Sequence, residues 1–241
     1  MAKKSFSIYD FLVIGIKSVL ENIRLFMLIF LSYIGITIAT VLTMGLVARP
    51  IIIVLWRMIP KFKSQFSTCA TKEACHGVMK SFWGQVYPIL ISNTLLLVFC
   101  GLLAIVVFAG LYLGFIQIML DLHKNGSSKV SRLFSCFHLV PKFLISAFIF
   151  FSAVSLGLAL FIVPGIYLFL RFRFFPYYVI DKDAGIIECI KKSYRATRGF
   201  EWDVLGLNIV AGVIWSITFF IGVPAASMMM VSAYKKLPTK V

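Results

Sequence analysis

The sequence predicts an all-α fold, a polytopic transmembrane helical bundle that forms one multi-pass domain over residues 1–241. Hydrophobic residues account for 61% of the chain, whereas soluble domains contain roughly 45–50%. Charged residues account for only 14%, and the mean hydropathy is +0.97. So few polar side chains could not cover the surface of a soluble domain of this size. The same composition excludes a disordered chain and a disulfide-rich secreted scaffold.

The excess of basic residues fits a membrane better than nucleic acid. Twenty-four Lys and Arg stand against nine Asp and Glu, which gives a net charge of +15. Loops on the cytoplasmic side of a membrane collect Lys and Arg, and anionic headgroups attract them. Folded nucleic-acid readers expose aromatic side chains on a soluble surface, but those of this chain lie inside hydrophobic runs. We therefore expect anionic membrane lipids as partners and no nucleic acid, with a protein partner or homo-oligomer left open.

Residues 6–23 predict an amphipathic helix that lies on the membrane surface. Asp10, Lys17 and Glu21 share one helical face, while apolar side chains occupy the other. The alternative is that this segment is the frayed start of the first spanning helix. The interfacial interpretation is favoured because several charges inside one span would be costly. We expect the N-terminus to be cytoplasmic and to carry no removable leader.

The first span is expected from Leu25 to about Val47, which supplies roughly the twenty apolar residues that a bilayer requires. Arg49 and Pro50 are expected to end it, because an Arg at membrane depth is expensive and the residue before Pro resists helical geometry. Residues 59–84 are the least apolar part of the chain. They are expected to form a polar basic loop, and the sequence leaves open on which side of the membrane it lies.

Residues 86–120 form a long apolar stretch. As one helix it would measure ~52 Å, well beyond a hydrocarbon core of ~30 Å. We therefore expect a strongly tilted helix, a helix broken near Gly101 or Gly110, or a tight hairpin. Gly110 and Gly114 place two small residues on one helix face, which would permit close packing against another helix.

The rest of the chain alternates amphipathic and spanning segments. Two further amphipathic interfacial helices are expected at 131–140 and 186–198. The second has a predicted apolar stripe of Ile187, Ile190 and Tyr194. The remaining apolar segments, expected to span or return through the membrane, are 143–163, 166–180, 203–220 and a short helix that ends at Tyr234.

These segments together predict about six spanning helices. Every substantial polar segment is basic, so a strict positive-inside count would place all of them in the cytoplasm. That arrangement requires eight crossings, each near the minimum length of ~17 residues. Eight crossings therefore remain the alternative to six.

Short motifs in the second half of the chain resemble a known family. They are Gly114–Gly126 (GFIQIMLDLHKNG), Leu133-Phe134, Ile162–Leu168 (IVPGIYL), Asp181–Asp183 (DKD), Cys189–Gly199 (CIKKSYRATRG) and Tyr234–Leu237 (YKKL). In this order they resemble the YciC-like group of uncharacterised bacterial inner-membrane proteins. A similar domain precedes the catalytic domain in some glycerophosphoryl diester phosphodiesterases. The resemblance covers about half of the chain and leaves residues 48–85 unmatched.

The resemblance implies a multi-pass domain of six-helix type in a bacterial cytoplasmic membrane. It implies no established activity and no catalytic residues. Phosphodiesterase activity is not transferred, because the resemblance does not include the catalytic domain.

Arg171 and Arg173 are the sharpest candidates for a functional site. Both lie inside an apolar run, and charge at membrane depth often lines a polar cavity or pairs with a carboxylate. The alternative, favoured by the nearby Asp181 and Asp183, is that the arginines reach the headgroups and orient the helix. If an anion or lipid phosphate is bound, these two guanidiniums are expected to hold it. The expected rim of that site consists of Lys191, Lys192, Arg195 and Arg198.

The sequence predicts no metal, no cofactor and no catalytic residue. Cys69, Cys75 and His76 lie together, but their spacing is not a standard zinc pattern. No Ser-His-Asp order, phosphate-binding loop or catalytic carboxylate pair is recognisable. We therefore expect that the protein is not an enzyme.

Two hypotheses about function follow from these patterns. The first is a non-enzymatic membrane domain that engages anionic lipid headgroups in envelope organisation. The alternative is a small transporter or lipid-handling protein with a polar cavity near Arg171 and Arg173. A cavity lined by these arginines would favour the alternative, and a solid bundle with both arginines at headgroup level would favour the first.

Overall fold

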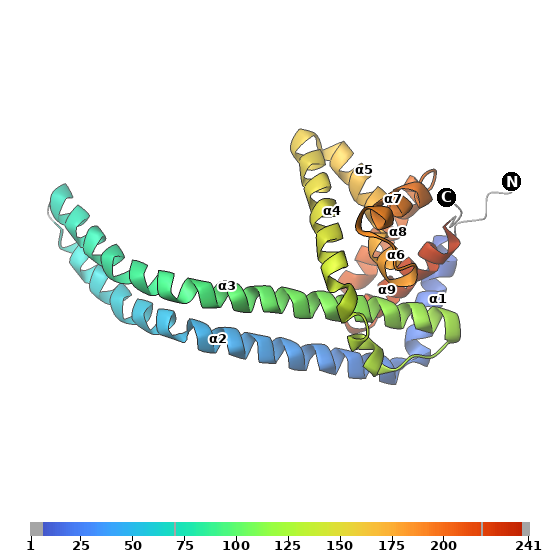
Figure 1. Ribbon diagram of the computed structural model, residues 1–241, viewed down its shortest axis with the longest axis horizontal. Helices are drawn as coiled ribbons and strands as arrows, with labels where there is room; N and C mark the ends of the chain where they lie inside the picture. The colour runs from blue at the N-terminus through green and yellow to red at the C-terminus, as the bar shows by residue number, and fades with distance from the viewer. Residues whose placement is uncertain (1–6, 70, 218, 238–241) are drawn as a thin grey trace. The chain divides into compact units, whose positions relative to one another are not determined.

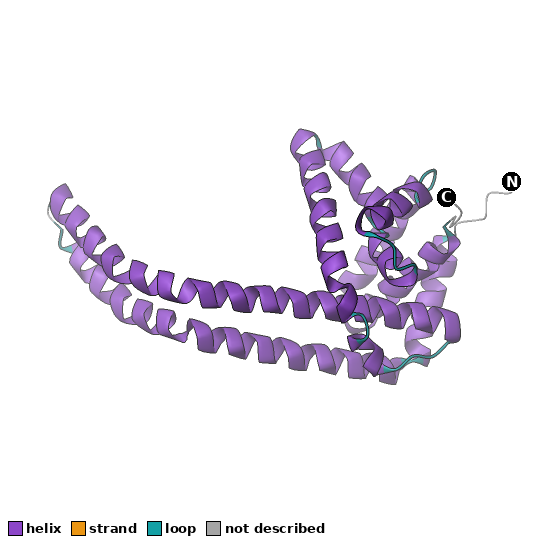
Figure 2. Ribbon diagram, viewed as in Figure 1, coloured by secondary structure: helices purple, strands orange, loops and turns teal. Residues whose placement is uncertain are grey.

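A computed structural model describes residues 7–69, 71–217 and 219–237, and within these ranges every regular element is helical (Figures 1 and 2). The predicted all-α fold class is therefore confirmed. The α-helices are α1 (Ile8–Glu21), α2 (Ile23–Ser67), α3 (Lys72–Asn125), α4 (Val140–Leu160), α5 (Ile162–Phe172), α6 (Phe175–Asp181), α7 (Ile186–Ala196), α8 (Glu201–Ile217) and α9 (Phe219–Lys236). Two 3-10 helices, η1 (Val130–Phe134) and η2 (Phe137–Leu139), lie between α3 and α4.

Three helical stretches among the described residues are long and apolar enough to cross a membrane. They are α2, α3 and the stretch Val130–Leu160 that ends with α4. Helices α5 and α8 contain 11 and 17 residues, respectively. Length and composition therefore make the chain compatible with a membrane location.

The chain divides into two compact units. One unit combines the residues up to Ser32 with those from Val107 onward, and the other covers Tyr33–Val106. Both long helices, α2 and α3, contribute residues to each unit. We describe each unit by itself.

The unit of Tyr33–Val106 corrects the prediction of a polar loop at residues 59–84. Helix α2 continues to Ser67 and α3 begins at Lys72, so nearly all of this segment is helical. The physical reason is aromatic packing. The ring of Phe62 lies 5.4 Å from that of Phe66 and 4.6 Å from that of Phe82, between centroids. These contacts stabilise helical structure in a segment whose charged side chains are solvated.

Proline does not end α2, contrary to the expectation that Arg49 and Pro50 stop the first span. Pro50 and Pro60 both lie inside α2, and Pro88 lies inside α3. A proline removes one backbone hydrogen bond and kinks a helix, but apolar helices tolerate it when the surrounding turns remain helical. The stretch 86–120 likewise belongs to one continuous helix rather than to a hairpin or a helix broken at a glycine.

In the larger unit, α1 is a helix separate from α2. Ser7 caps its first turn by accepting a hydrogen bond from the Asp10 backbone N–H, and the chain leaves helical geometry at Asn22. Its buried face packs on α9, where a Cβ added at Gly15 would lie 2.7 Å from the Ala225 carbonyl oxygen. Asp10, Lys17 and Glu21 lie on the exposed side. These features support a separate amphipathic helix over the frayed start of a span.

Helices α4 and α5 form a tight hairpin. The turn is at Phe161, where the backbone is extended. A Cβ added at Gly157 would lie 2.9 Å from the Gly165 Cα, so the two helices pack with their backbones close together. Such contact requires small residues on both helices.

The segment 131–140 is not an amphipathic α-helix, which corrects a second prediction. It consists of η1 and η2, separated at Ser135, whose hydroxyl donates to the Arg132 carbonyl oxygen at 2.7 Å. Phe134 in this segment is exposed. The tight 3-10 turns lie directly on α3. An added Cβ at Gly110 would lie 2.6 Å from the Phe137 ring, and one at Gly114 would overlap the Leu133 carbonyl oxygen. The glycine pair thus does allow close packing, but its partner is this 3-10 segment.

An aromatic cluster forms the centre of the larger unit. Tyr234 on α9 is 1% exposed, and its ring contacts those of Phe174, Tyr177 and Tyr178 at centroid distances of 6.5, 5.3 and 5.0 Å. Such pairs stabilise a fold beyond the area that they bury. The cluster connects α9 to α6 and to the residue that precedes it.

We expect Gly114→Ala to destabilise this unit strongly, because the new Cβ would overlap the Leu133 backbone. The expected loss is roughly 2 kcal/mol or more, measured as a lower midpoint of thermal unfolding in neutral detergent. Gly212→Ala is the matched control, since an added Cβ there meets no atom within 4 Å. Similar midpoints for the two variants would contradict the close packing of α3 on η1.

Candidate functional site

Helix α7 turns one face into the protein and the opposite face outward. Cys189, Ile190, Ser193 and Ala196 are buried, and the helix packs on α4, α5 and α6. At its start, the Glu188 carboxylate accepts a hydrogen bond from the Gly185 backbone N–H at 3.3 Å. A helix lies where residues 186–198 were predicted to be helical, and it ends at Ala196. Of the three residues in the predicted apolar stripe, Ile190 is buried and the other two are exposed.

The outward face combines unpaired cations with apolar side chains. Lys191, Arg195 and Arg198 are exposed, and none of them makes an ion pair with another residue in the described ranges. Ile187 and Tyr194 are exposed on the same side. We call these five residues the α7 surface. Cations beside exposed apolar side chains are typical of a helix in a membrane interface.

Two further residues complete the surroundings of the α7 surface. Lys192, predicted as part of the rim, instead pairs with Glu188 at 2.6 Å, between Nζ and Oε1. Trp202, just beyond the helix, is 83% exposed. Tryptophan is enriched at the level of lipid headgroups, so its position is consistent with an interfacial α7.

Arg171 is buried rather than open to headgroups or to a ligand. Its side chain is 5% exposed, and Nη2 lies 2.6 Å from the Glu201 Oε1. Nη2 also donates to the Tyr167 hydroxyl at 2.5 Å, and Nη1 donates to the Tyr194 carbonyl oxygen at 3.3 Å. The guanidinium carbon lies 4.9 Å from the ring centroid of Tyr167 and 4.8 Å from that of Tyr194. The planar guanidinium of arginine suits such a stacked, buried ion pair better than the ammonium group of lysine does.

The backbone of Arg171 is held as firmly as its side chain. Its carbonyl oxygen accepts hydrogen bonds from the hydroxyls of Ser193 (2.9 Å) and Thr197 (3.2 Å). Ser193 also accepts from the Phe174 backbone N–H at 3.1 Å. These hydrogen bonds satisfy backbone groups in the turn between the end of α5 and the start of α6. They also hold α7 against this turn. Ser193 and Thr197 therefore orient the α7 surface.

The carboxylate that pairs with Arg171 is Glu201 at the start of α8. Burial raises its pKa, but hydrogen bonds from backbone N–H groups at Gly199 and Glu201 and the charge of Arg171 outweigh burial, and the pKa lies below its ordinary value. The sequence analysis named no particular carboxylate for this role. Glu201 was missed because it lies 30 positions from Arg171 in sequence, and only the packing of α8 on α5 brings the two together.

Arg173 has a different environment from Arg171. It lines a cavity of about 290 Å³ formed by residues of α3, α6, α8 and α9. Its guanidinium lies 5.3 Å from the Phe169 ring centroid. Within the described residues it makes no ion pair or hydrogen bond with another side chain. The two predicted arginines thus do not form one site: one is buried in an ion pair, and the other faces a cavity.

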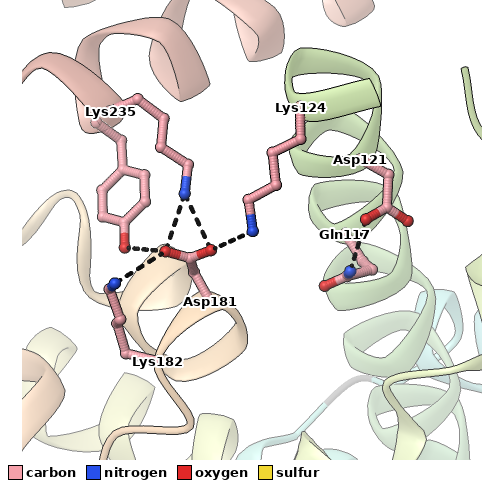
Figure 3. A network of polar contacts seen from close by, with 7 residues as sticks. Gln117, Asp121, Lys124, Asp181, Lys182 and Lys235 are labelled. Atoms are coloured by element: carbon pink, nitrogen blue, oxygen red, sulfur yellow. Dashed lines mark hydrogen bonds and ion pairs between the residues drawn. The ribbon is translucent and has the colours of Figure 1, made fainter. Parts of the chain in front are cut away.

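Asp181 is the centre of a second polar cluster (Figure 3). Its side chain is 5% exposed and lies 3.0 Å from the Lys124 Nζ and 2.9 Å from the Lys235 Nζ. The Tyr234 hydroxyl donates to the same carboxylate at 3.1 Å. Burial raises the pKa of Asp181, but the hydrogen bonds from Lys235 and Lys124 outweigh it and hold the pKa below its ordinary value. The cluster joins the ends of α3, α6 and α9.

The second aspartate of this turn, Asp183, pairs with Lys142 at 2.7 Å on the surface. The motif that contains Asp181 and Asp183 was visible in the sequence. Its lysine partners were not, since Lys124 and Lys235 lie 57 and 54 positions away. In the described ranges, no group of three or more His, Cys, Asp or Glu could hold a metal ion.

The described chain is thus an all-α protein with three helices that could cross a membrane and a basic helix, α7, on its surface. It belongs to the family described as Domain of unknown function (DUF7847), whose model matches residues 85–240. No curated protein and no solved structure matches the chain. The description of the family states no function, so the function is inferred from the residues themselves.

We expect Glu201→Gln to destabilise the protein by about 2 kcal/mol or more, because it leaves the buried Arg171 charge without its partner. The measurement is the midpoint of thermal unfolding in neutral detergent. Glu188→Gln breaks the exposed Glu188–Lys192 pair and serves as the control, with an expected loss below roughly 0.5 kcal/mol. Equal losses of stability in the two variants would contradict the larger cost that we expect from breaking the buried pair.

Acidification is expected to destabilise the protein partly through Asp181. Because its pKa is lower in the folded state, its contribution is present at neutral pH and is lost as the pH falls through the folded-state value. Asp181→Asn should therefore lower the unfolding midpoint at about pH 7 and flatten its dependence on pH below about 4. Asp183→Asn removes an exposed pair and should change the profile much less. If the unfolding midpoints of Asp181→Asn and of the unaltered chain depend on pH in the same way, Asp181 does not cause the loss of stability in acid.

Proposed function

We propose that this chain is a multi-pass membrane protein that engages anionic lipid headgroups through the α7 surface and has a non-enzymatic role in envelope organisation. The observation that carries the proposal is three exposed cations, on and directly after the outward face of α7, that lie beside Ile187 and Tyr194 and make no ion pair with a described residue. Each Lys or Arg near an anionic membrane surface contributes about 1 kcal/mol of attraction. The exposed apolar side chains of the α7 surface would insert into the membrane interface and strengthen the binding further.

The proposed topology has six crossings, made by α2, α3, α4, α5 together with α6, α8 and α9. Exposed apolar side chains along α4 support it, because Phe148, Phe151 and Leu160 are 74, 64 and 73% exposed. Such residues are costly in water and favourable in lipid. The resemblance to YciC-like proteins supports a bacterial cytoplasmic membrane as the location.

The α7 surface suits a membrane interface for two reasons. First, its cations are free to bind phosphate oxygens, since the acidic residue within α7, Glu188, is already paired with Lys192. Second, the inner face of α7 is fixed by Ser193 and Thr197, so the outer face is presented at a defined angle. A preorganised cationic surface binds anions with less loss of entropy than a mobile one.

The test is the selectivity of the protein for anionic lipid in a bilayer. The chain is reconstituted in phosphatidylcholine with spin-labelled phosphatidylglycerol, and electron spin resonance gives the relative association constant of the two lipids. We expect the triple variant Lys191→Gln, Arg195→Gln, Arg198→Gln to lower the preference for phosphatidylglycerol at least about fivefold. Molar salt should weaken the preference of the unaltered chain in the same direction.

The matched control removes the same number of charges elsewhere. Lys61→Gln, Lys63→Gln, Lys72→Gln changes three exposed lysines near the ends of α2 and α3. A smaller effect of the control supports a specific role of α7. If both triple variants lose selectivity equally, net charge alone explains it, and the proposal fails.

A further inference from the structure

The Arg173 cavity has an electrostatic feature that the α7 surface does not explain. It is enclosed by parts of α3, α6, α8 and α9 that all belong to the larger unit. Among the described residues that line it, Arg173 is the only one with a charged side chain. A cation that faces a partly enclosed, largely apolar cavity without a carboxylate is costly unless a counterion enters.

Arg171 supplies the comparison, because it lies only two residues earlier on the same segment. Its guanidinium has Glu201 at 2.6 Å and two hydrogen-bond acceptors. Arg173 has the ring of Phe169 at 5.3 Å from its guanidinium carbon, and it makes no ion pair with any residue that the structure describes. A guanidinium carries five N–H donors. The charge that satisfies Arg171 is therefore internal, whereas no acidic side chain of the described chain is paired with Arg173.

Two tyrosine hydroxyls can assist Arg173. Tyr112 and Tyr177 line the same cavity and are close enough to Arg173 to interact with its charge. The other polar side chains of the lining are already engaged within their helices. Asn208 donates to the Val204 carbonyl oxygen at 2.7 Å, and Ser227 donates to the Val223 carbonyl oxygen at 2.8 Å. We therefore expect the hydroxyls of Tyr112 and Tyr177 to join Arg173 in binding an anion.

The rest of the cavity suits hydrocarbon. Phe115, Trp215 and Met230 contribute to its lining, and methionine adapts to irregular apolar ligands. A volume of about 290 Å³ is at the lower end of ligand pockets. It can hold an anionic head with the first part of a chain, while the remainder of the chain leaves through the open side.

We propose that the cavity beside Arg173 binds a single-chain amphiphile with an anionic head, a carboxylate or a phosphate, which Arg173, Tyr112 and Tyr177 hold while Phe115, Trp215 and Met230 contact its hydrocarbon chain. This site is distinct from the α7 surface, since none of residues 186–198 lines the cavity. It extends the proposed function from the engagement of headgroups at the surface to the binding of one lipid-like molecule inside the protein.

Trp215 reports directly on binding at this site. Trp56→Phe, Trp83→Phe and Trp202→Phe in the full chain leave Trp215 as the only tryptophan. In neutral detergent, added dibromostearate should quench its fluorescence in a saturable manner, because bromine quenches only at short range. The neutral methyl ester of dibromostearate, at the same concentrations, should quench weakly and without saturation. Equal quenching by acid and ester would overturn the requirement for an anionic head.

Arg173→Gln should weaken the binding of dibromostearate by roughly tenfold or more, because the substitution removes a charge-assisted hydrogen bond. Arg173→Lys should retain part of the affinity because it keeps the charge. Lys191→Gln removes one cation from the α7 surface and should leave quenching unchanged, which separates this site from the proposed function. Unchanged affinity in Arg173→Gln would overturn the proposal.

A second variant covers the case in which Arg173→Gln does not fold. Gly212 lines the cavity, and a Cβ added there meets no atom within 4 Å. Gly212→Leu should therefore fold, reduce the free volume and weaken quenching by dibromostearate several-fold. Full quenching in a folded Gly212→Leu protein would argue against binding inside the cavity.

Competition distinguishes the two possible heads. Unbrominated oleate and lysophosphatidic acid are each added to the complex with dibromostearate, and recovery of Trp215 fluorescence shows which of them displaces it. Displacement by either one supports the site and identifies the preferred head. Inorganic phosphate alone should not displace dibromostearate. If it does so at concentrations similar to those of the amphiphiles, the site recognises the anion without a chain, and the proposal is overturned.

Discussion

The larger unit depends on the burial of one positive charge. The guanidinium of Arg171 is almost fully buried, and Glu201 and two tyrosines surround it and compensate for its lost hydration. Its partners come from α5, α7 and α8, so the same interaction fixes three helices that are separate in sequence. A buried ion pair contributes little net stability, since desolvation offsets the attraction, but it strongly disfavours arrangements in which either charge is left alone. We therefore infer that this pair specifies the packing of these helices.

The orientation of both candidate sites follows from the position of Arg171. Its carbonyl oxygen binds Ser193 and Thr197, so the inner face of α7 is fixed and the cationic face points outward. Arg173 lies past the end of α5, and the turn there places it at the cavity rather than beside Glu201. The carboxylates decide which cations are available for ligands. Glu201, Asp181 and Glu188 neutralise particular basic residues, whereas the cations of the α7 surface and Arg173 make no ion pair with a described residue.

Helices with continuous apolar patterns were predictable from the sequence, and so were α1 and α7. The errors occurred where local signals were weak or misleading. Pro50 suggested the end of a helix, yet α2 continues through it, and residues 59–84 looked like a loop because they are charged. Their helical structure depends on Phe62 and Phe82, whose contact joins positions that are distant in sequence. Residues 131–140 have an apolar pattern, but the close approach of α3 at Gly114 leaves room only for 3-10 turns.

The sequence by itself determined the fold class, the basic character of the chain and the residue types of the candidate sites. Composition and periodicity decide these properties because burial and solvation act on each residue separately. Only the tertiary structure decided which charges neutralise one another. Arg171 and Arg173 are alike in sequence, but one meets Glu201 and the other meets a cavity. Pairing depends on which distant side chains come within a few ångströms, and that distance is set by the packing of whole helices.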